Sequence, residues 1–347
     1  MKNRLKLEKT VSVDEKMREL TIPESTYGLF GIADLHEPAD DETVEVLTQN
    51  IQKSMSIHAD MYPLPEMWTD KGNPRGSVRK IEMEDSVFYP GTKHTVWVYV
   101  PAAYREEEPA DLAVFFDSQM YVKDADKNYY DYMPLCLLLD NMIAAGEIPP
   151  TIGVVASYGK PGPGQPFMGF REGHVNRSYE YDMTSDLNAR FVIEELLPQA
   201  LEGLSVSADP ADHFICGLSS SAIASFAAGW FRNDFFGNVF QASPSFANIR
   251  NGIVWPSAIR IGEKKKLKVY TVSGRYDLDN NFGNWLLVDL QVGSALQFRG
   301  YDSRFYISQA GHSAEVLRYC MEAALAWLLG GKEPAEDGKL EKIDFGN

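Results

Sequence analysis

A serine between an apolar run and a run of small residues is the first candidate for chemistry. The segment from Gly217 to Ser221 (GLSSS) follows HFIC at 213–216 and precedes AIASFAAGW. A serine at a strand-to-helix turn is typical of a nucleophile elbow, which lifts the hydroxyl out of the carboxyl edge of a parallel sheet. The spacing indicates Ser219 as a nucleophile for acyl transfer, with Ser221 where glycine is usual. The alternative is a loop whose serines cap a helix.

A nucleophilic serine needs an acid and a base, which in such sites follow later strands in the order Ser, Asp, His. Asp277 follows LKVYTV at 267–272, and His312 follows RFYI at 304–307. A single histidine is more often structural, but its place just past the last predicted strand favours a base. Asp279 stays open as the acid, because it lies two residues after Asp277; it could instead cap the next helix.

The tetrahedral oxyanion of acyl transfer needs backbone N–H donors. Ser220, the residue after the nucleophile, supplies one. The second is expected from the loop after an early strand, and the segment from Asp117 to Tyr121 (DSQMY) follows LAVFF at 112–116. We predict that this loop belongs to the site. In the alternative interpretation Asp117 and Ser118 are ordinary turn residues.

The segment from Tyr158 to Tyr181 is expected to form a pocket wall. It follows the predicted strand IGVVA at 152–156, and ligands of open α/β sheets bind outside the carboxyl ends of the strands. The candidates for substrate contact are Asp117, Gln119, Tyr121, Arg177 and Tyr181. An ion pair between Arg177 and Glu180 that holds the loop is the alternative for this arginine.

The sequence predicts neither a metal nor a cofactor. It has no His-x-His, Glu-x-x-His or cysteine cluster, and no EF-hand spacing follows Asp277, Asp279 and Asn280. The segment from Pro161 to Gly164 alternates proline with glycine and lacks a following Lys-Ser/Thr, so it does not form a phosphate-binding loop.

Short β-rich runs alternate with amphipathic segments, which is the order of a parallel sheet with crossover helices. The predicted strands are 94–100, 112–116, 152–156, 213–216, 239–242, 267–272 and 304–307, and the predicted helices are 41–55, 133–145, 183–204, 220–230, 284–298 and 313–329. We expect a polar N-terminal extension at residues 1–74, one α/β domain at 75–332 and an exposed polar tail at 333–347.

Five segments in this order resemble the putative esterase family of α/β-hydrolases: LAVFFDSQMYV, NRSYEYD, GLSSSAIASFAAGWFRNDFFGNVFQASPSF, SGRYD and AGHSAEVLR. This family includes enterochelin esterases, esterase D-type enzymes, feruloyl esterases and the antigen 85 mycolyltransferases. The resemblance spans roughly residues 80 to 330 and is nearest to the enterochelin esterase-like branch. It implies an α/β-hydrolase fold with a mostly parallel central sheet and helices on both faces.

The resemblance also implies site residues: Ser219 as nucleophile, Asp277 as acid, His312 as base and an oxyanion donor near Ser118. The chain departs from the family pattern at Ser118 and at Ser221, where glycine is common. Its polar N-terminal stretch is unlike the β-sandwich that precedes the hydrolase domain of enterochelin esterases.

Composition limits the partners and the compartment. With 33 basic and 49 acidic residues the formal net charge is −16, which disfavours nucleic acid and anionic membranes. Cys136, Cys216 and Cys320 are widely spaced and are expected to be buried thiols. No signal peptide or apolar run of 18 residues occurs, so we expect a cytoplasmic protein.

The sequence therefore predicts a serine esterase that acts on a small-molecule ester without a cofactor. Two alternatives stay open, namely an acyltransferase with the same triad and a non-catalytic hydrolase-fold protein that binds a ligand. The departures at Ser118 and Ser221 motivate the second. Whether the chain forms a homo-oligomer is also left open.

Overall fold

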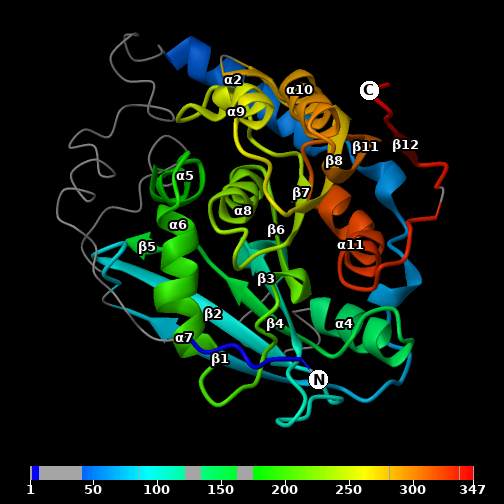
Figure 1. Cartoon of the computed structure of the whole chain (residues 1–347). Coiled ribbons are helices and arrows are strands. Elements are labelled where there is room, and N and C mark those ends of the chain that lie inside the picture. The colour runs from blue at the N-terminus through cyan, green and yellow to red at the C-terminus, as the bar shows by residue number, and fades with distance from the viewer. Residues whose placement is uncertain are drawn as a thin grey trace.

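The computed structural model describes residues 2–7, 41–84, 86–121, 134–161, 175–280, 282–335 and 337–346. A ten-stranded sheet runs through the middle of the molecule (Figure 1). Its strands are β1 (Ser77–Met83), β2 (Thr92–Val100), β3 (Asp111–Phe116), β4 (Thr151–Ala156), β5 (Lys160–Pro161), β6 (His213–Leu218), β7 (Asn238–Ala242), β8 (Lys268–Tyr276), β11 (Asp302–Gly311) and β12 (Leu340–Lys342).

The strand order is β1-β2-β4-β3-β6-β7-β8-β11-β12, with β5 paired to β2. All pairs from β4 to β11 are parallel, whereas the pairs at both edges are antiparallel. The mostly parallel sheet that the sequence predicts is thus confirmed. The carboxyl ends of its parallel strands lie side by side, and we call this side of the sheet the carboxyl edge. The segments that follow β3, β6, β7, β8 and β11 meet there, and they carry the predicted site residues.

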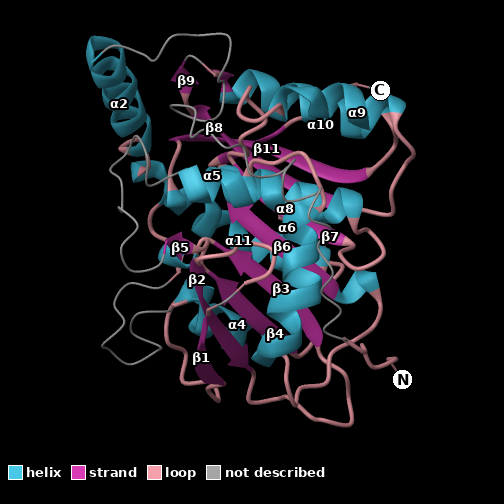
Figure 2. Cartoon of the chain, turned by 90° about the vertical axis from the view of Figure 1, so that its left-hand side faces the viewer, coloured by secondary structure: helices cyan, strands magenta, loops and turns pink. Residues whose placement is uncertain are grey.

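Helices cover both faces of the sheet, as predicted (Figures 1 and 2). The helices are α2 (Asp41–Met55), α4 (Leu135–Ala144), α5 (Val175–Tyr181), α6 (Leu187–Arg190), α7 (Leu197–Ala200), α8 (Ser220–Phe231), α9 (Trp255–Ile261), α10 (Trp285–Phe298) and α11 (Ala314–Leu328). One apolar cluster includes residues of α4 and α11, and the other includes residues of α6 to α10. Residues of β3 alternate between the two clusters, which explains why its sequence is continuously apolar.

Several elements differ from the sequence prediction. The helix predicted at 183–204 begins only at Leu187 and contains a π-helical stretch, Phe191–Leu196, between α6 and α7. Strands β1 and β12 were not predicted, because edge strands pair through their backbone and can carry mostly exposed, charged side chains. β12 lies within the segment that we expected to be an exposed tail.

The three cysteines are free and buried, as predicted. Burial raises the pKa of the Cys136, Cys216 and Cys320 thiols above the ordinary value. Among the described residues, no helix combines the length and the apolar character needed to cross a membrane.

Candidate active site

Ser219 stands between the last residue of β6 and the first residue of α8, as the elbow prediction requires. Its φ of 63° and ψ of −123° are strained for a residue with a Cβ atom. Backbone hydrogen bonds hold this conformation, since Ser219 N donates to Ala242 O at 3.0 Å and Ser245 N donates to Ser219 O at 3.2 Å. The strained turn is therefore fastened to the end of β7.

Ser221 fits where glycine is usual because its hydroxyl bonds to the strand that enters the turn. Its Oγ donates to Leu218 O at 2.7 Å and accepts from Leu218 N at 2.9 Å. The close contact falls on Gly217 instead, where a Cβ atom would lie 2.4 Å from the backbone of Ser221. The departure from the family pattern is thus compatible with the elbow.

Asp277 follows β8 and meets His312, which follows β11. Nδ1 of His312 lies 2.7 Å from Oδ1 of Asp277, and the N–H of Leu278 donates to the same oxygen at 2.7 Å. Burial alone would raise the pKa of Asp277, but the charge of His312 and these hydrogen bonds hold it below its ordinary value. A buried carboxylate that stays ionised can orient the imidazole and stabilise its protonated form.

Asp279 is not beside the histidine. It is exposed and pairs through its backbone with Asn284 in a short hairpin of β9 (Asp279–Asn280) and β10 (Gly283–Asn284). It does not cap the next helix either, because the side chain of Asn284 accepts from Leu287 N at the start of α10. Of the two candidates, Asp277 is the carboxylate that the structure brings to His312.

The hydroxyl of Ser219 lies 3.1 Å from Oγ of Ser245. Within the described residues it makes no direct hydrogen bond to His312, which is common in sites without substrate. Sequence reasoning missed Ser245. The segment Ser243-Pro244-Ser245 directly follows β7, so it carried the same signal as the predicted triad residues, which also follow parallel strands.

The two predicted oxyanion donors both stand at helix starts. Ser220 is the first residue of α8, and Ser118 is the first residue of a 3₁₀ helix, Ser118–Met120. The first N–H groups of a helix find no acceptor within it and can bind an anion. Asp117, just before, adopts the left-handed conformation (φ 63°) that turns the chain from β3 into this helix.

Arg177 of α5 pairs with Asp117, whereas the alternative that we left open for this arginine was a pair with Glu180. Arg177 Nε donates to Asp117 Oδ1 at 2.9 Å, and its Nη2 donates to Asp117 and to Leu218 O. Glu180 instead accepts from Gly159 N at 2.8 Å and lies 3.1 Å from His94 Nε2. Arg177 therefore ties the segment before Ser118 to the residue before Ser219.

The other predicted contact residues divide by exposure. Gln119 is exposed, and its Nε2 donates to Asp117 Oδ1 at 2.9 Å. Tyr121 and Tyr181 are each only 2% exposed and belong to the apolar clusters, so the structure does not support substrate contact by either. Residues 162–174 of the predicted pocket wall lie outside the described residues.

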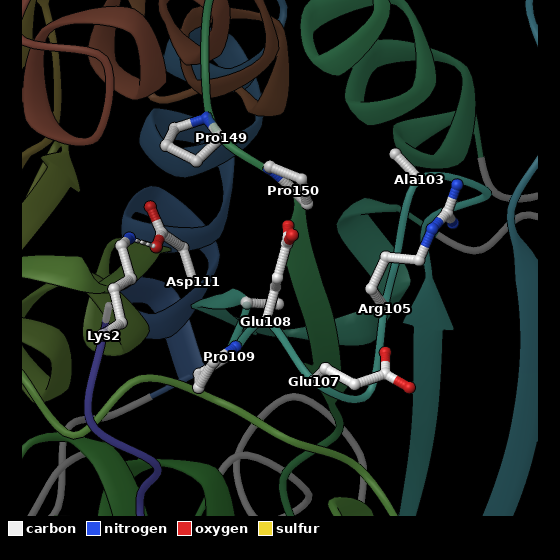
Figure 3. A pocket seen from close by; sticks show the side chains of 10 residues that line it. Lys2, Ala103, Arg105, Glu107, Glu108, Pro109, Asp111, Pro149 and Pro150 are labelled. Carbon is white, nitrogen blue, oxygen red and sulfur yellow. Dashed lines mark hydrogen bonds and ion pairs between the residues drawn. The ribbon is translucent and has the colours of Figure 1, made fainter.

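A pocket of about 320 Å³ lies at the amino ends of the parallel strands, opposite the carboxyl edge (Figure 3). It is lined by residues before and at the starts of β3 and β4, among them Asp111 and Pro150, and by Lys2. No predicted site residue lines it. Among the described residues, no group of three histidine, cysteine or acidic side chains could hold a metal ion.

Comparison with known proteins finds esterases among the similar proteins. The family described as Putative esterase matches residues 89–317. An iron(III) enterobactin esterase of Dickeya dadantii is 23% identical over 255 residues, which make up 69% of this chain and 52% of that enzyme. The chain thus spans about half the length of this curated relative.

Solved structures share the fold at low sequence identity. The enterobactin esterase of Shigella flexneri superposes with a TM-score of 0.59 at 17% identity, covering 78% of this chain and 64% of that one. A ferulic acid esterase of the anaerobic fungus Anaeromyces mucronatus superposes with a TM-score of 0.58 at 15% identity, covering 76% and 94%. The predicted α/β-hydrolase fold is confirmed. Because the family match spans more than half of the chain, the protein belongs to the putative esterase family.

Proposed function

We propose that this protein hydrolyses carboxylic esters through an acyl-enzyme on Ser219. The observation that carries the proposal is a serine on a strained strand-to-helix turn, at the sheet edge where Asp277 and His312 lie 2.7 Å apart. Membership in the putative esterase family supports the reaction class. The proposed substrate is a small-molecule ester, as enterobactin and ferulate esters are for the related enzymes.

In the proposed reaction His312 Nε2 removes the proton of Ser219 Oγ while that oxygen attacks the ester carbonyl. The imidazolium donates from Nδ1 to Asp277, whose lowered pKa keeps its carboxylate charged. His312 then gives its proton to the departing alkoxide, and the alcohol leaves. Water, deprotonated by His312, attacks the acyl-enzyme; the bond between the acyl carbon and Ser219 Oγ then breaks, His312 returns the proton to Oγ, and the acid is released.

We further propose that the N–H groups of Ser118 and Ser220 bind the oxyanion of each tetrahedral intermediate. The Asp117–Arg177 pair supports this role, because it links the first donor segment to Leu218, next to the nucleophile. Arg177 is then a positioning residue for the donors. Substrate selection falls to other side chains at the edge, such as the exposed Gln119.

Steady-state kinetics on an ester panel test the proposal. The panel contains p-nitrophenyl acetate and butyrate, a ferulate ester and iron(III) enterobactin, the last two because related proteins act on them. We expect hydrolysis of at least one ester, its loss in Ser219→Ala and its retention in Ser220→Ala, which keeps the backbone N–H. An inactive wild-type protein, or an active Ser219→Ala variant, contradicts the proposal. Product bearing an added alcohol in place of free acid indicates an acyltransferase.

A further inference from the structure

A serine of the N-terminal extension touches the backbone on both sides of the Asp277–His312 pair. Ser54, in the last turn of α2, is 6% exposed. Its Oγ donates to Tyr276 O at 2.7 Å and accepts from His312 N at 2.9 Å. Tyr276 directly precedes Asp277. One hydroxyl therefore joins the segment that carries the acid to the residue that carries the base.

The backbone next to Ser54 adds two close approaches. Gly311 N donates to Ile57 O at 2.7 Å, and a Cβ atom on Gly311 would lie 2.1 Å from Ser54 O. No residue with a Cβ atom fits at position 311 while α2 stays in place. The C-terminal end of α2 is thus fastened to the His312 segment, although α2 lies at the outside of the molecule near β9 (Figure 2).

The two strands that lead to Asp277 and His312 pair irregularly near their carboxyl ends. The pairing of β8 with β11 is in register up to Ser308 and Gly274, and it then shifts before Gly311 pairs with Tyr276. Such an irregularity disrupts the ladder locally and leaves backbone groups that do not pair across the two strands. The link through Ser54 lies at this irregular end.

We infer that Ser54 is a positioning residue that holds His312 against Asp277, so that the N-terminal extension completes the acid-base half of the site. This inference rests on the proposed function. A hydroxyl suits the place because it donates to one backbone group and accepts from another at once. Alanine at this position leaves Tyr276 O and His312 N without this partner.

Ser54→Ala and the matched control Ser56→Ala test the inference in the full-length protein. Ser56 is exposed and lies just past the end of α2, and its Oγ donates to Lys53 O in the last turn of that helix. With p-nitrophenyl acetate we expect Ser54→Ala to lower kcat about 10- to 100-fold with little change in KM, since small misplacements of catalytic groups have effects of this size. Ser56→Ala should match the wild type.

The proton on His312 Nδ1 gives a readout that does not depend on turnover. Its NMR resonance should shift or broaden in Ser54→Ala and stay in place in Ser56→Ala. A double-mutant cycle with Asp277→Asn should show strong coupling, with Ser54→Ala having little effect once the acid is lost. Wild-type kcat together with an unchanged resonance in Ser54→Ala overturns the inference.

The two proposals can fail separately. A wild-type protein that hydrolyses no ester contradicts the proposed function, whereas the His312 resonance still tests the contact with Ser54. If Ser54→Ala does not fold, Ser54→Cys replaces it, because a thiol has nearly the same shape and forms weaker hydrogen bonds. Ser54→Cys should also lower kcat and shift the resonance, and wild-type behaviour in this folded variant overturns the inference.

Discussion

Two aspartates with buried side chains, one at the amino end and one at the carboxyl end of the parallel strands, have pKa values shifted in opposite directions. Asp111 begins β3 and forms an ion pair with Lys2 (Figure 3). Nζ of Lys2 also lies 3.1 Å from Oδ2 of Asp212. Burial nevertheless raises the pKa of Asp111 to about 6, against the effect of Lys2. Asp277 follows β8, and there the partners outweigh burial, so its pKa is lowered.

The difference lies in the partners of the two carboxylates. Asp277 accepts from the ring of His312 and from the backbone N–H of Leu278, both anchored at strand ends. Asp111 depends on Lys2, a long side chain that is 38% exposed and belongs to a short segment near the chain terminus. The negative charge of Asp212 also raises the pKa of Asp111, whereas His312 and the N–H of Leu278 both lower the pKa of Asp277. The proposed chemistry requires a charged carboxylate at the position of Asp277.

The largest expected effect comes from removing the charge of Asp277. Asp277→Asn keeps the shape of the side chain but loses the carboxylate that orients His312, so kcat/KM should fall about 10⁴-fold. Asp279→Asn is the matched control two residues away and should have little effect, because Asp279 is exposed. Ester hydrolysis rates check the ranking, and the reverse ranking would move the acid to Asp279.

A third aspartate sharpens the comparison, because Asp117 follows the same strand that Asp111 begins. Asp117 is fully buried and holds Arg177 through two oxygens. Arg177→Ala leaves this carboxylate without its main partner and should lower the free energy of unfolding by about 3–5 kcal/mol.

Arg232→Ala, which removes a partly exposed pair with Asp234, should cost only about 0–1 kcal/mol. Urea denaturation measures both arginine variants. Equal small losses would show that the Asp117–Arg177 pair is unimportant for folding.

The titrations of Asp111 and Asp277 should change the free energy of unfolding with opposite signs as the pH rises. Because the folded-state pKa of Asp111 is raised from 3.8 to about 6, its ionisation weakens the fold as the pH rises through that interval. Asp111→Asn should therefore gain stability relative to the wild type between about pH 4 and pH 6.

The lowered pKa of Asp277 has the opposite effect. Its contribution to stability is present above the ordinary value of 3.8 and is lost as the pH falls through the folded-state pKa. Chemical denaturation of the wild type, Asp111→Asn and Asp277→Asn across pH 3 to 7 checks both signs. A flat difference for Asp111→Asn would contradict the raised pKa.

A small effect is expected from truncating Ser221, whose hydroxyl bonds to Leu218 at the elbow. Ser221→Ala loses the hydrogen bonds to Leu218 and should cost about 1 kcal/mol. Ser221→Gly should also keep activity, with a further helix-propensity cost of up to about 1 kcal/mol. Ser221→Leu should damage folding, because position 221 is fully buried against Gly217. Thermal unfolding and ester hydrolysis compare the three variants.

Local patterns mark the residues that the sequence predicted for the candidate site. Ser219, Asp277 and His312 each follow an apolar run, and parallel strands must deliver such residues to one edge. The partners of these residues left no local signal. Ser54 reaches His312 across 258 positions of sequence, and Arg177 reaches Asp117 across 60. Side-chain contacts at such separations depend on packing that periodicity does not encode.

The edge strand β12 was missed for a related reason. β12 has exposed and half-buried side chains, and it joins β11 through backbone hydrogen bonds that any residue except proline can donate. Residues 1–74 were predicted to form a polar N-terminal extension, and their helix at 41–55 is mostly polar. Its contact with the site uses one small residue, Ser54, and the backbone of Ile57.

Trapping the acyl-enzyme tests the central claim most directly. The wild-type protein is mixed with an activated ester, quenched in acid within the first turnovers, digested and analysed by mass spectrometry. The account predicts an added acyl mass on Ser219, absent from Ser219→Ala and retained in Ser220→Ala. Hydrolysis that proceeds with the acyl group on another residue would contradict the assignment of Ser219 as the nucleophile.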